Sequence, residues 1–495
     1  MSRRPAVALG AVVVVLALLA STMVAGALGT GGSLPWHGCG GGFQCATLSV
    51  PVDWNQPGGE QVALAISRHP ASDPKHRLGT LVVNFGGPGD PGAETLRMGG
   101  LTGFPAEIRA RFDVVSFDPR GTGQSRPIAC VDDHTYDEFL AEDPTPDTAQ
   151  QFESFYAGTN GPVDLVAACL SRQGQWLGQV GTRNTARDLE ALRAALGTPK
   201  LTFLGYSYGT VLGAIYAQLY PNRVGPMVLD GAVNLSDTAA SELQANAVGF
   251  EQALDAFLND CATRKSCAYN HGGDPRVALA TLQQRFESGY RVPVADGRQA
   301  GATLFYLALA AALYDRANWP YLARALADAE RGRGDLLASF ADSITGRGAD
   351  GHFDHLQEAL NAIRCDDRPD ALVSFDAYRT QYTQYSQQFP IFGAFLAASP
   401  IGCDPRLPRP PPSQQVGDVR VTGTGPILIV GTTGDPATPY AGAIDLQQRL
   451  TGSRILTLVS TEHAGYAKGI SCIDNAVDNY LLHRTLPPVG RRCRP

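Results

Sequence analysis

Residues 205–209 read Gly-Tyr-Ser-Tyr-Gly, and this G-x-S-x-G pattern is typical of a nucleophilic serine. The apolar run 201–204 before it predicts a buried strand, and residues 210–220 after it predict a helix. A serine on so tight a turn needs small neighbours, which the two flanking glycines provide. The turn also places the Tyr208 N–H at the positive end of the helix, where it could stabilise an oxyanion. The pattern therefore predicts Ser207 as a nucleophile.

A serine nucleophile needs a base, and the chain offers nine histidines. His463 follows the apolar run 455–459 after a short turn, at the carboxyl end of an expected strand, where open α/β sheets bind their ligands. Most of the other histidines lie in loops, near prolines or among leucines, and the pair His352 and His355 is too little for a metal site. We therefore expect His463 to be the general base and expect no metal.

The third member of a catalytic triad is a carboxylate that orients the imidazole. Asp435 follows the expected strand near 426–430, and Asp230 follows the one at 227–229. Both lie at the carboxyl end of a strand, and both keep the chain order Ser–Asp–His that this architecture uses. The residues alone therefore leave Asp435 and Asp230 as alternatives.

Residues 87–92 fit the G-x-G-x-x-G pattern of a dinucleotide site, directly after the expected strand at 81–85. Two prolines in this run remove backbone N–H donors that a dinucleotide would need, and its aspartate would repel a pyrophosphate. We instead predict an oxyanion loop, in which the Gly87 N–H acts together with the Tyr208 N–H. No cofactor is expected.

The elements that must position these residues predict an α/β sheet protein. Seven short apolar runs are expected as strands: 62–66, 81–85, 114–117, 201–204, 227–229, 427–430 and 455–459. Most of them are continuous rather than alternating, as in strands buried on both faces of a parallel sheet. Helical spacing replaces this alternation of strands and helices between about 236 and 400. We therefore predict a mostly parallel sheet formed by residues 28–235 and 401–495, with a helical cap inserted at 236–400.

The N-terminus has the pattern of a secretory signal peptide. Arg3 and Arg4 precede an apolar run at 6–20, and Ala25-Gly26-Ala27 offers the small residues that a signal peptidase accepts. We expect residues 1–27 to be removed and the protein to be secreted or associated with the cell envelope. The alternative is an uncleaved anchor, because the apolar stretch is long enough to span a bilayer, and this is the only membrane contact expected.

Ten cysteines follow the signal peptide, and an even number outside the cytosol favours disulfides. No pair has the C-x-x-C spacing of a zinc or redox site. We expect neighbours to pair, because each such loop stays within one predicted region: Cys39–Cys45, Cys130–Cys169, Cys261–Cys267, Cys365–Cys403 and Cys472–Cys493.

The composition of the 495 residues, with 44% hydrophobic and 18% charged residues, is that of a globular protein. The net charge of −7 includes no run of lysine or arginine, so nothing indicates a nucleic-acid partner.

Several segments together resemble the exported bacterial tripeptidyl aminopeptidases, which are serine peptidases of the α/β-hydrolase fold related to proline iminopeptidases. They are residues 84–89 (NFGGPG), 112–125 (FDVVSFDPRGTGQS), 205–210 (GYSYGT), 434–439 (GDPATP) and His463. The match covers essentially the whole chain after the signal peptide. It implies Ser207 as nucleophile, His463 as base and Asp435, rather than Asp230, as acid. The chain departs from the family at 464–465, where Ala-Gly stands in place of the glycine that often follows the histidine directly.

The resemblance implies an aminopeptidase that releases short peptides, tripeptides in particular, from the free N-termini of peptide or protein substrates. Such an enzyme must bind an α-ammonium group with carboxylates, and Asp366 and Asp367 beside Cys365 are candidates. Two alternatives fit the same residues: a secreted carboxylesterase or lipase with the same triad, and a non-catalytic cell-envelope binding protein on a hydrolase scaffold.

Overall fold

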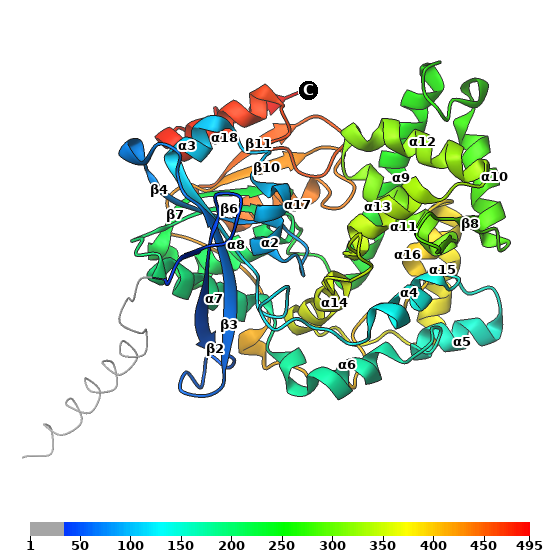
Figure 1. The fold of residues 1–495 in the computed structure, drawn as a ribbon, viewed down its shortest axis with the longest axis horizontal. Helices are drawn as coiled ribbons and strands as arrows, with labels where there is room; N and C mark the ends of the chain where they lie inside the picture. Colours follow the sequence, from blue (N-terminus) through cyan, green and yellow to red (C-terminus); the bar gives the residue numbers. More distant parts are fainter. Residues whose placement is uncertain (1–33) are drawn as a thin grey trace, which may run out of the picture.

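The computed structural model describes residues 34–495, so the predicted signal peptide at 1–27 lies outside the described residues. A ten-stranded sheet in the order β1-β2-β3-β5-β4-β6-β7-β10-β11-β12 runs through one half of the molecule (Figure 1). Its strands are β1 (His37–Gly38), β2 (Gln44–Pro51), β3 (Gln61–His69), β4 (Gly79–Asn84), β5 (Phe112–Phe117), β6 (Leu201–Tyr206), β7 (Val224–Asp230), β10 (Leu428–Thr432), β11 (Arg454–Leu458) and β12 (Arg492–Cys493). The pairs from β1 to β5 through β2 and β3 are antiparallel, and all other pairs are parallel.

The seven strands expected from the apolar runs are all present, as β3 to β7, β10 and β11. Strands β4, β5, β6, β7 and β10 lie inside the sheet and are largely buried, which explains their continuous apolar character. The three strands of this sheet that the sequence did not indicate, β1, β2 and β12, lie at or near its two ends. Of these, β2 mixes exposed and buried positions, while β1 and β12 are only two residues long.

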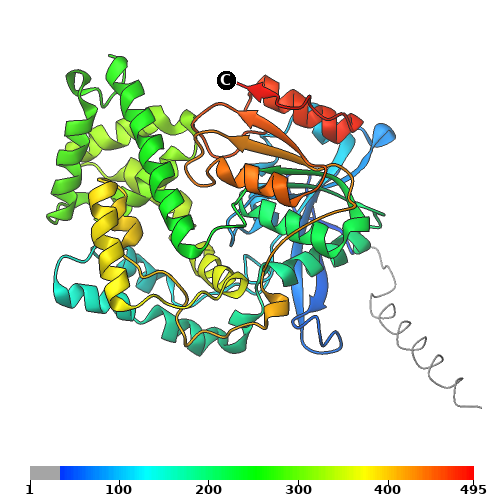
Figure 2. The same cartoon turned by 180° about the vertical axis from the view of Figure 1, so that it is seen from behind.

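Helices cover both faces of the sheet. Helices α7, α8 and α17 contribute to a hydrophobic core on one face, and α3 and α18 contribute to a core on the other. Figure 2 shows the same layers from behind. The bounds of these helices are α3 (Ala106–Arg111), α7 (Thr182–Ala195), α8 (Tyr208–Leu219), α17 (Ala441–Arg449) and α18 (Ser471–His483). A further short helix, α2 (Gly92–Thr95), follows β4.

The segment between β7 and β10 is mostly helical and lies beside the sheet (Figure 1). Most of its helices share a third hydrophobic core, which is separate from the two cores of the sheet. Its elements are α9 (Ala239–Thr263), α10 (Pro275–Glu287), β8 (Val292–Pro293), β9 (Gln299–Ala300), α11 (Ala302–Leu313), α12 (Trp319–Glu330), α13 (Asp335–Thr345), α14 (Leu356–Asp367), α15 (Phe375–Gln388) and α16 (Gly393–Ala397). We call this segment with its core the helical part.

Three helices that follow β5 lie along the helical part, although they precede it in sequence: α4 (Asp133–Ala141), α5 (Ala149–Ala157) and α6 (Leu165–Gln173) (Figure 1). Leu140 of α4 belongs to the core of the helical part. The Tyr156 hydroxyl of α5 donates a hydrogen bond to the Val373 carbonyl at 2.8 Å. The helical part therefore also packs against residues outside 236–400, and the division of the chain at 235 and 400 stays a prediction.

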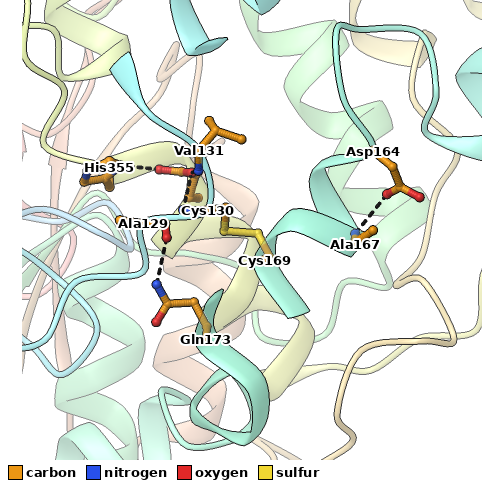
Figure 3. Close-up of a disulfide and its surroundings, with 9 residues drawn as sticks. Ala129, Cys130, Val131, Asp164, Ala167, Cys169, Gln173 and His355 are labelled. Carbon is orange, nitrogen blue, oxygen red and sulfur yellow. Dashed lines mark hydrogen bonds and ion pairs between the residues drawn. A yellow bond between two sulfur atoms is a disulfide. The ribbon is translucent and has the colours of Figure 1, made fainter. Parts of the chain in front are cut away.

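Helix α14 connects the helical part to the sheet and its covering helices, which together we call the sheet domain. Apolar residues of α14 belong to one of the two cores of the sheet. Glu358 of this helix accepts hydrogen bonds from the N–H groups of Cys130 (2.8 Å) and Val131 (3.3 Å), and its other oxygen contacts Nδ1 of His355. Figure 3 shows residues 129–131 of the chain after β5 and the disulfide that joins Cys130 to Cys169 of α6. The chain after β5 is thus held between α14 and α6.

The structure contains five disulfides, and each joins neighbouring cysteines as predicted: Cys39–Cys45, Cys130–Cys169, Cys261–Cys267, Cys365–Cys403 and Cys472–Cys493. None of the helices within residues 34–495 has both the length and the apolar character that crossing a bilayer requires.

Candidate active site

Ser207 lies on a sharp turn between β6 and α8, with φ 54° and ψ −120°. This backbone conformation is strained for a residue with a side chain. The turn closes tightly: a Cβ atom on Gly205 would lie 2.3 Å from the Gly209 carbonyl oxygen, and one on Gly209 would lie 2.8 Å from Oδ1 of Asn84. The Ser207 N–H donates a hydrogen bond to the Asp230 carbonyl at 2.8 Å, which fixes the turn to strand β7. Only glycine fits at positions 205 and 209, two residues before and two residues after this serine.

The His463 imidazole contacts a buried carboxylate. Its Nδ1 lies 2.9 Å from Oδ1 and 3.0 Å from Oδ2 of Asp435. The Asp435 side chain has no exposed surface, and the His463 side chain is 11% exposed. A proton on Nδ1 that donates to this carboxylate leaves Nε2 free to accept one. This pair therefore has the arrangement that a general base requires.

Backbone and hydroxyl donors hold the Asp435 carboxylate in place. Its oxygens accept hydrogen bonds from the N–H groups of Ala437 (3.0 Å), Thr438 (2.8 Å) and Ala464 (3.1 Å), and from the Thr438 hydroxyl at 3.0 Å. The same hydroxyl lies 3.2 Å from Nδ1 of His463. Sequence reasoning gave Thr438 no role, although an Asp followed three residues later by Thr is a spacing that favours such local hydrogen bonds.

Asp230, the alternative acid, binds a different group. Its carboxylate accepts hydrogen bonds from the N–H groups of Gly465 (3.0 and 3.1 Å) and Tyr466 (2.7 Å), in the loop that follows the histidine. Burial raises the pKa of Asp230 to about 6, although the two N–H donors oppose this rise. Of the two alternatives that the residues left open, Asp435 is the one that contacts the imidazole.

Ser207 and His463 lie at the same edge of the sheet. Strands β6 and β7 are parallel neighbours with Tyr206 opposite Asp230, which places Ser207 beside Gly231. A Cβ atom on Gly231 would lie 3.2 Å from Cε1 of His463. Within residues 34–495 no hydrogen bond joins the serine hydroxyl to the imidazole, but such bonds often tighten only when substrate is bound.

The predicted oxyanion loop passes directly beside the serine. A Cβ atom on Gly86 would lie 3.1 Å from Cβ of Ser207, so the backbone approaches as closely as it can. Gly87 has φ 93°, a conformation that favours glycine. Tyr208 is the first residue of α8, so its N–H is one of those that a helix leaves unpaired. Both N–H groups belong to backbone that adjoins Ser207.

Asp366 and Asp367 are buried at the end of α14, and their contacts are with backbone N–H groups and one threonine hydroxyl. Asp366 accepts hydrogen bonds from the N–H groups of Val180 (2.9 Å) and Gly181 (3.0 Å). Asp367 accepts from the N–H (2.6 Å) and the hydroxyl (2.5 Å) of Thr182, which begins α7. Burial raises the pKa of Asp366 to about 8 and that of Asp367 to about 6.

These two carboxylates bind the start of α7, and within residues 34–495 neither forms a hydrogen bond with Ser207, His463 or Asp435. The expectation that they bind an α-ammonium group therefore gains no support from their contacts. The N-terminal N–H groups of a buried helix need acceptors, and these aspartates supply them.

His352 and His355, the two histidines considered as a metal pair, each contact a carboxylate. His352 contacts Asp133, and His355 contacts Glu358. In the part of the chain from 34 onward, no group of three or more histidine, cysteine or acidic side chains has the geometry to hold a metal ion.

Comparison with known proteins places this site in a family. The model of the alpha/beta hydrolase fold matches residues 98–271, and the model described as TAP-like protein matches residues 388–493. The serine protease Hip1 of Mycobacterium tuberculosis is 37% identical over 470 residues, which cover 92% of this chain and 88% of that protein. The chain belongs to this family of α/β-hydrolase serine peptidases. The fold and the enzyme class expected from the sequence are therefore confirmed.

Other relatives in this α/β-hydrolase family carry different names. The tripeptidyl aminopeptidase of Streptomyces lividans is 30% identical over 474 residues, covering 93% of this chain and 86% of that protein. A protein named carboxylesterase B from Mycobacterium tuberculosis is 35% identical over 466 residues, covering 91% and 86%. The family thus includes relatives named for peptide and for ester hydrolysis, and this chain is a serine peptidase.

Proposed function

We propose that the protein is an exported aminopeptidase that releases short peptides, tripeptides in particular, from the free N-termini of peptide or protein substrates. The proposal assigns Ser207 as nucleophile, His463 as general base and Asp435 as acid. The observation that carries it is the contact between Nδ1 of His463 and the buried Asp435, at the sheet edge that also bears Ser207. The named relative from Streptomyces lividans supports tripeptide release.

In the proposed mechanism, Nε2 of His463 takes the proton of the Ser207 hydroxyl while Oγ attacks the carbonyl carbon of the scissile peptide. The N–H groups of Gly87 and Tyr208 donate to the oxygen that becomes negative in the tetrahedral intermediate. His463 then gives its proton to the leaving amine, and an acyl-enzyme remains on Ser207. Water, activated by the same imidazole, hydrolyses this ester and restores the serine.

Export of the protein is part of the proposal. Five disulfides in one chain favour an oxidising compartment outside the cytosol, since thiols are kept reduced in most cytosolic proteins. The expected signal peptide is consistent with the same compartment.

We also propose that residues 236–400 form a cap over the site. The core of the helical part, separate from the cores of the sheet, supports this division. So do contacts of the helical part with the loops of the triad: the Asn246 amide donates to the Ala437 carbonyl at 2.9 Å, and the His463 N–H donates to the Tyr314 carbonyl at 2.9 Å. A cap in this position limits how much of a peptide chain reaches the serine, as release of short N-terminal peptides requires.

Replacement of Ser207 tests the nucleophile. Ser207→Ala should fold, but its kcat on a tripeptide anilide should fall by at least about 10⁴-fold, because no other hydroxyl can form the acyl-enzyme. A fluorophosphonate probe should label the wild-type protein on the peptide that contains Ser207 and should leave the variant unlabelled. A folded Ser207→Ala variant with substantial turnover, or a label on another serine, would contradict the proposed site.

A second function, hydrolysis of carboxylic esters, is favoured by the relative named carboxylesterase B. The two functions separate when one anilide is offered with a free and with an acetylated N-terminus, beside a short acyl ester. An aminopeptidase should lose kcat/KM on the acetylated tripeptide, because acetylation removes the ammonium charge. Equal cleavage of both peptides, or a strong preference for the ester, would favour the second function.

A further inference from the structure

The turn between α11 and α12 contacts the loop that carries the histidine. The Tyr314 carbonyl accepts a hydrogen bond from the His463 N–H at 2.9 Å. The Tyr314 ring packs perpendicular to the imidazole, with centroids 5.0 Å apart and an angle of 79° between the planes. Asp315 forms an ion pair with Lys468, with 2.8 Å between Oδ2 and Nζ. Backbone, ring and charge thus join one turn of the helical part to one loop of the sheet domain.

The sheet domain holds the same loop from another side. Asp230, at the end of β7, binds the N–H groups of Gly465 and Tyr466, which lie between the two points held by the helical part. The loop from 463 to 468 is therefore fixed by contacts with both parts of the molecule. The Asp435 contact fixes only the Nδ1 end of the imidazole, whereas the perpendicular Tyr314 ring limits the tilt of the ring as a whole.

The loop after β10 that carries Asp435, which we call the acid loop, is also in contact with the helical part. A Cβ atom on Gly249 of α9 would lie 2.5 Å from the Pro436 carbonyl oxygen, so α9 packs against this loop with no space between them. Phe250, the next residue of α9, contacts Tyr314 with ring centroids 5.9 Å apart. Helix α9 therefore connects the acid loop to the turn that touches the base.

We propose that Tyr314 is a positioning residue for His463, and that the Asp315–Lys468 ion pair fastens the turn that carries it. The inference rests on the proposed function, because it takes His463 as the base. It means that the helical part does more than cover the site, since it sets the orientation in which Nε2 meets the serine proton. Displacement of a catalytic base by as little as 1 Å strongly lowers the rate of the catalysed reaction. Loss of the Tyr314 contact should therefore lower kcat.

Three variants test the role of the ring. Tyr314→Leu removes the perpendicular contact, and we expect kcat on a free-amine tripeptide anilide to fall about tenfold while KM changes less than twofold. Tyr314→Phe keeps the ring and should retain most of the wild-type kcat. Tyr290→Leu is the matched control, because Tyr290 packs against the core of the same helical part and bonds to the Ala329 carbonyl. It should lower the melting temperature without lowering kcat.

The ion pair gives a test that does not depend on the ring. Asp315→Lys and Lys468→Asp should each lower kcat, by about twofold to fivefold for a partly exposed pair, and the double exchange should restore most of the loss. This series decides the question if Tyr314→Leu does not fold. The inference is overturned if the single exchanges leave kcat unchanged, if a folded Tyr314→Leu variant has wild-type kcat, or if its KM rises while kcat holds.

The controls separate this inference from the proposed function. If His463→Ala or Ser207→Ala retains turnover, the proposed triad is wrong and Tyr314 has no base to position. If both abolish turnover while all Tyr314 variants behave like Tyr290→Leu, the triad stands and only the positioning role fails.

Discussion

Two regions of the molecule each contain a pair of buried aspartates, and the pairs have different partners. At the carboxyl edge of the sheet, Asp435 and Asp230 hold the imidazole of His463 and the loop that follows it. At the end of α14, Asp366 and Asp367 hold only the backbone and the threonine that begin α7. Burial raises the pKa of Asp230, Asp366 and Asp367 alike.

The comparison teaches that a buried acid with a raised pKa is not by itself a sign of function. Burial disfavours the charged form wherever a carboxylate is removed from water. What distinguishes the edge of the sheet is the partner, because one of its two carboxylates contacts a side chain that can carry a proton. The α14 pair instead supplies acceptors for the N–H groups at the start of a buried helix.

The largest effect should come from Asp435→Asn. An asparagine amide would donate to Nδ1 and place the imidazole proton on Nε2, where it could no longer accept the serine proton. We expect kcat to fall by about 10³- to 10⁴-fold, with the fold preserved and circular dichroism unchanged. Steady-state kinetics of Asp435→Asn beside Asp230→Asn check the ranking; a greater loss in Asp230→Asn would move the acid to the neighbouring strand.

A smaller loss, of about tenfold in kcat/KM, should follow from Asp230→Asn, because one carboxylate oxygen that holds the histidine loop is replaced by a donor. The pH profile sharpens this prediction. Since the pKa of Asp230 is about 6, acidification below that value protonates it and removes an acceptor from the loop. The wild-type kcat/KM should therefore fall more steeply below about pH 6 than that of Asp230→Asn, which lacks this ionisation. Equal slopes in the two proteins would contradict a role for Asp230.

The sequence was sufficient to predict the strands of the sheet interior, the elbow at Ser207 and all five disulfides, because these depend on local patterns. Continuous apolar runs indicate buried strands, and glycines flank a strained serine. The residues alone could not separate Asp435 from Asp230, although the family resemblance favoured Asp435, since both lie at the carboxyl ends of neighbouring parallel strands. The sequence also carried no signal for Tyr314, whose contact with His463 joins residues 149 positions apart through the packing of the helical part.

Asp366 and Asp367 also show that the sequence does not reveal which distant groups a residue contacts. The adjacent acids looked like a site for an ammonium group, because sequence alone does not show which backbone N–H groups a helix end must satisfy. Their partners, Val180, Gly181 and Thr182, lie far away in the chain, and only the fold brings them together.

The smallest effect on catalysis should come from Asp366→Asn, and it separates the two pairs most directly. Asparagine keeps an oxygen for the N–H groups of Val180 and Gly181 and cannot ionise, so kcat and KM should not change. Stability should change with pH. The pKa of Asp366 is raised from 3.8 to about 8, so the folded protein holds a proton that the unfolded chain has lost, and wild-type stability falls as pH rises from about 4 to 8.

The variant lacks this dependence, and urea unfolding at pH 6 and pH 8.5 measures the difference. Relative to wild type, Asp366→Asn should gain about 1–3 kcal/mol between the two pH values. Asp366→Ala should show the same change with pH but should be about 1–3 kcal/mol less stable than Asp366→Asn at both, because it leaves two N–H groups unpaired. An increase in KM of tenfold for the free-amine tripeptide in Asp366→Asn, with no change for an acyl ester, would instead assign this carboxylate to the substrate. The contrast between the two pairs would then disappear. Asp366 would bind the ammonium group of the substrate, just as Asp435 contacts the imidazole that takes up a proton.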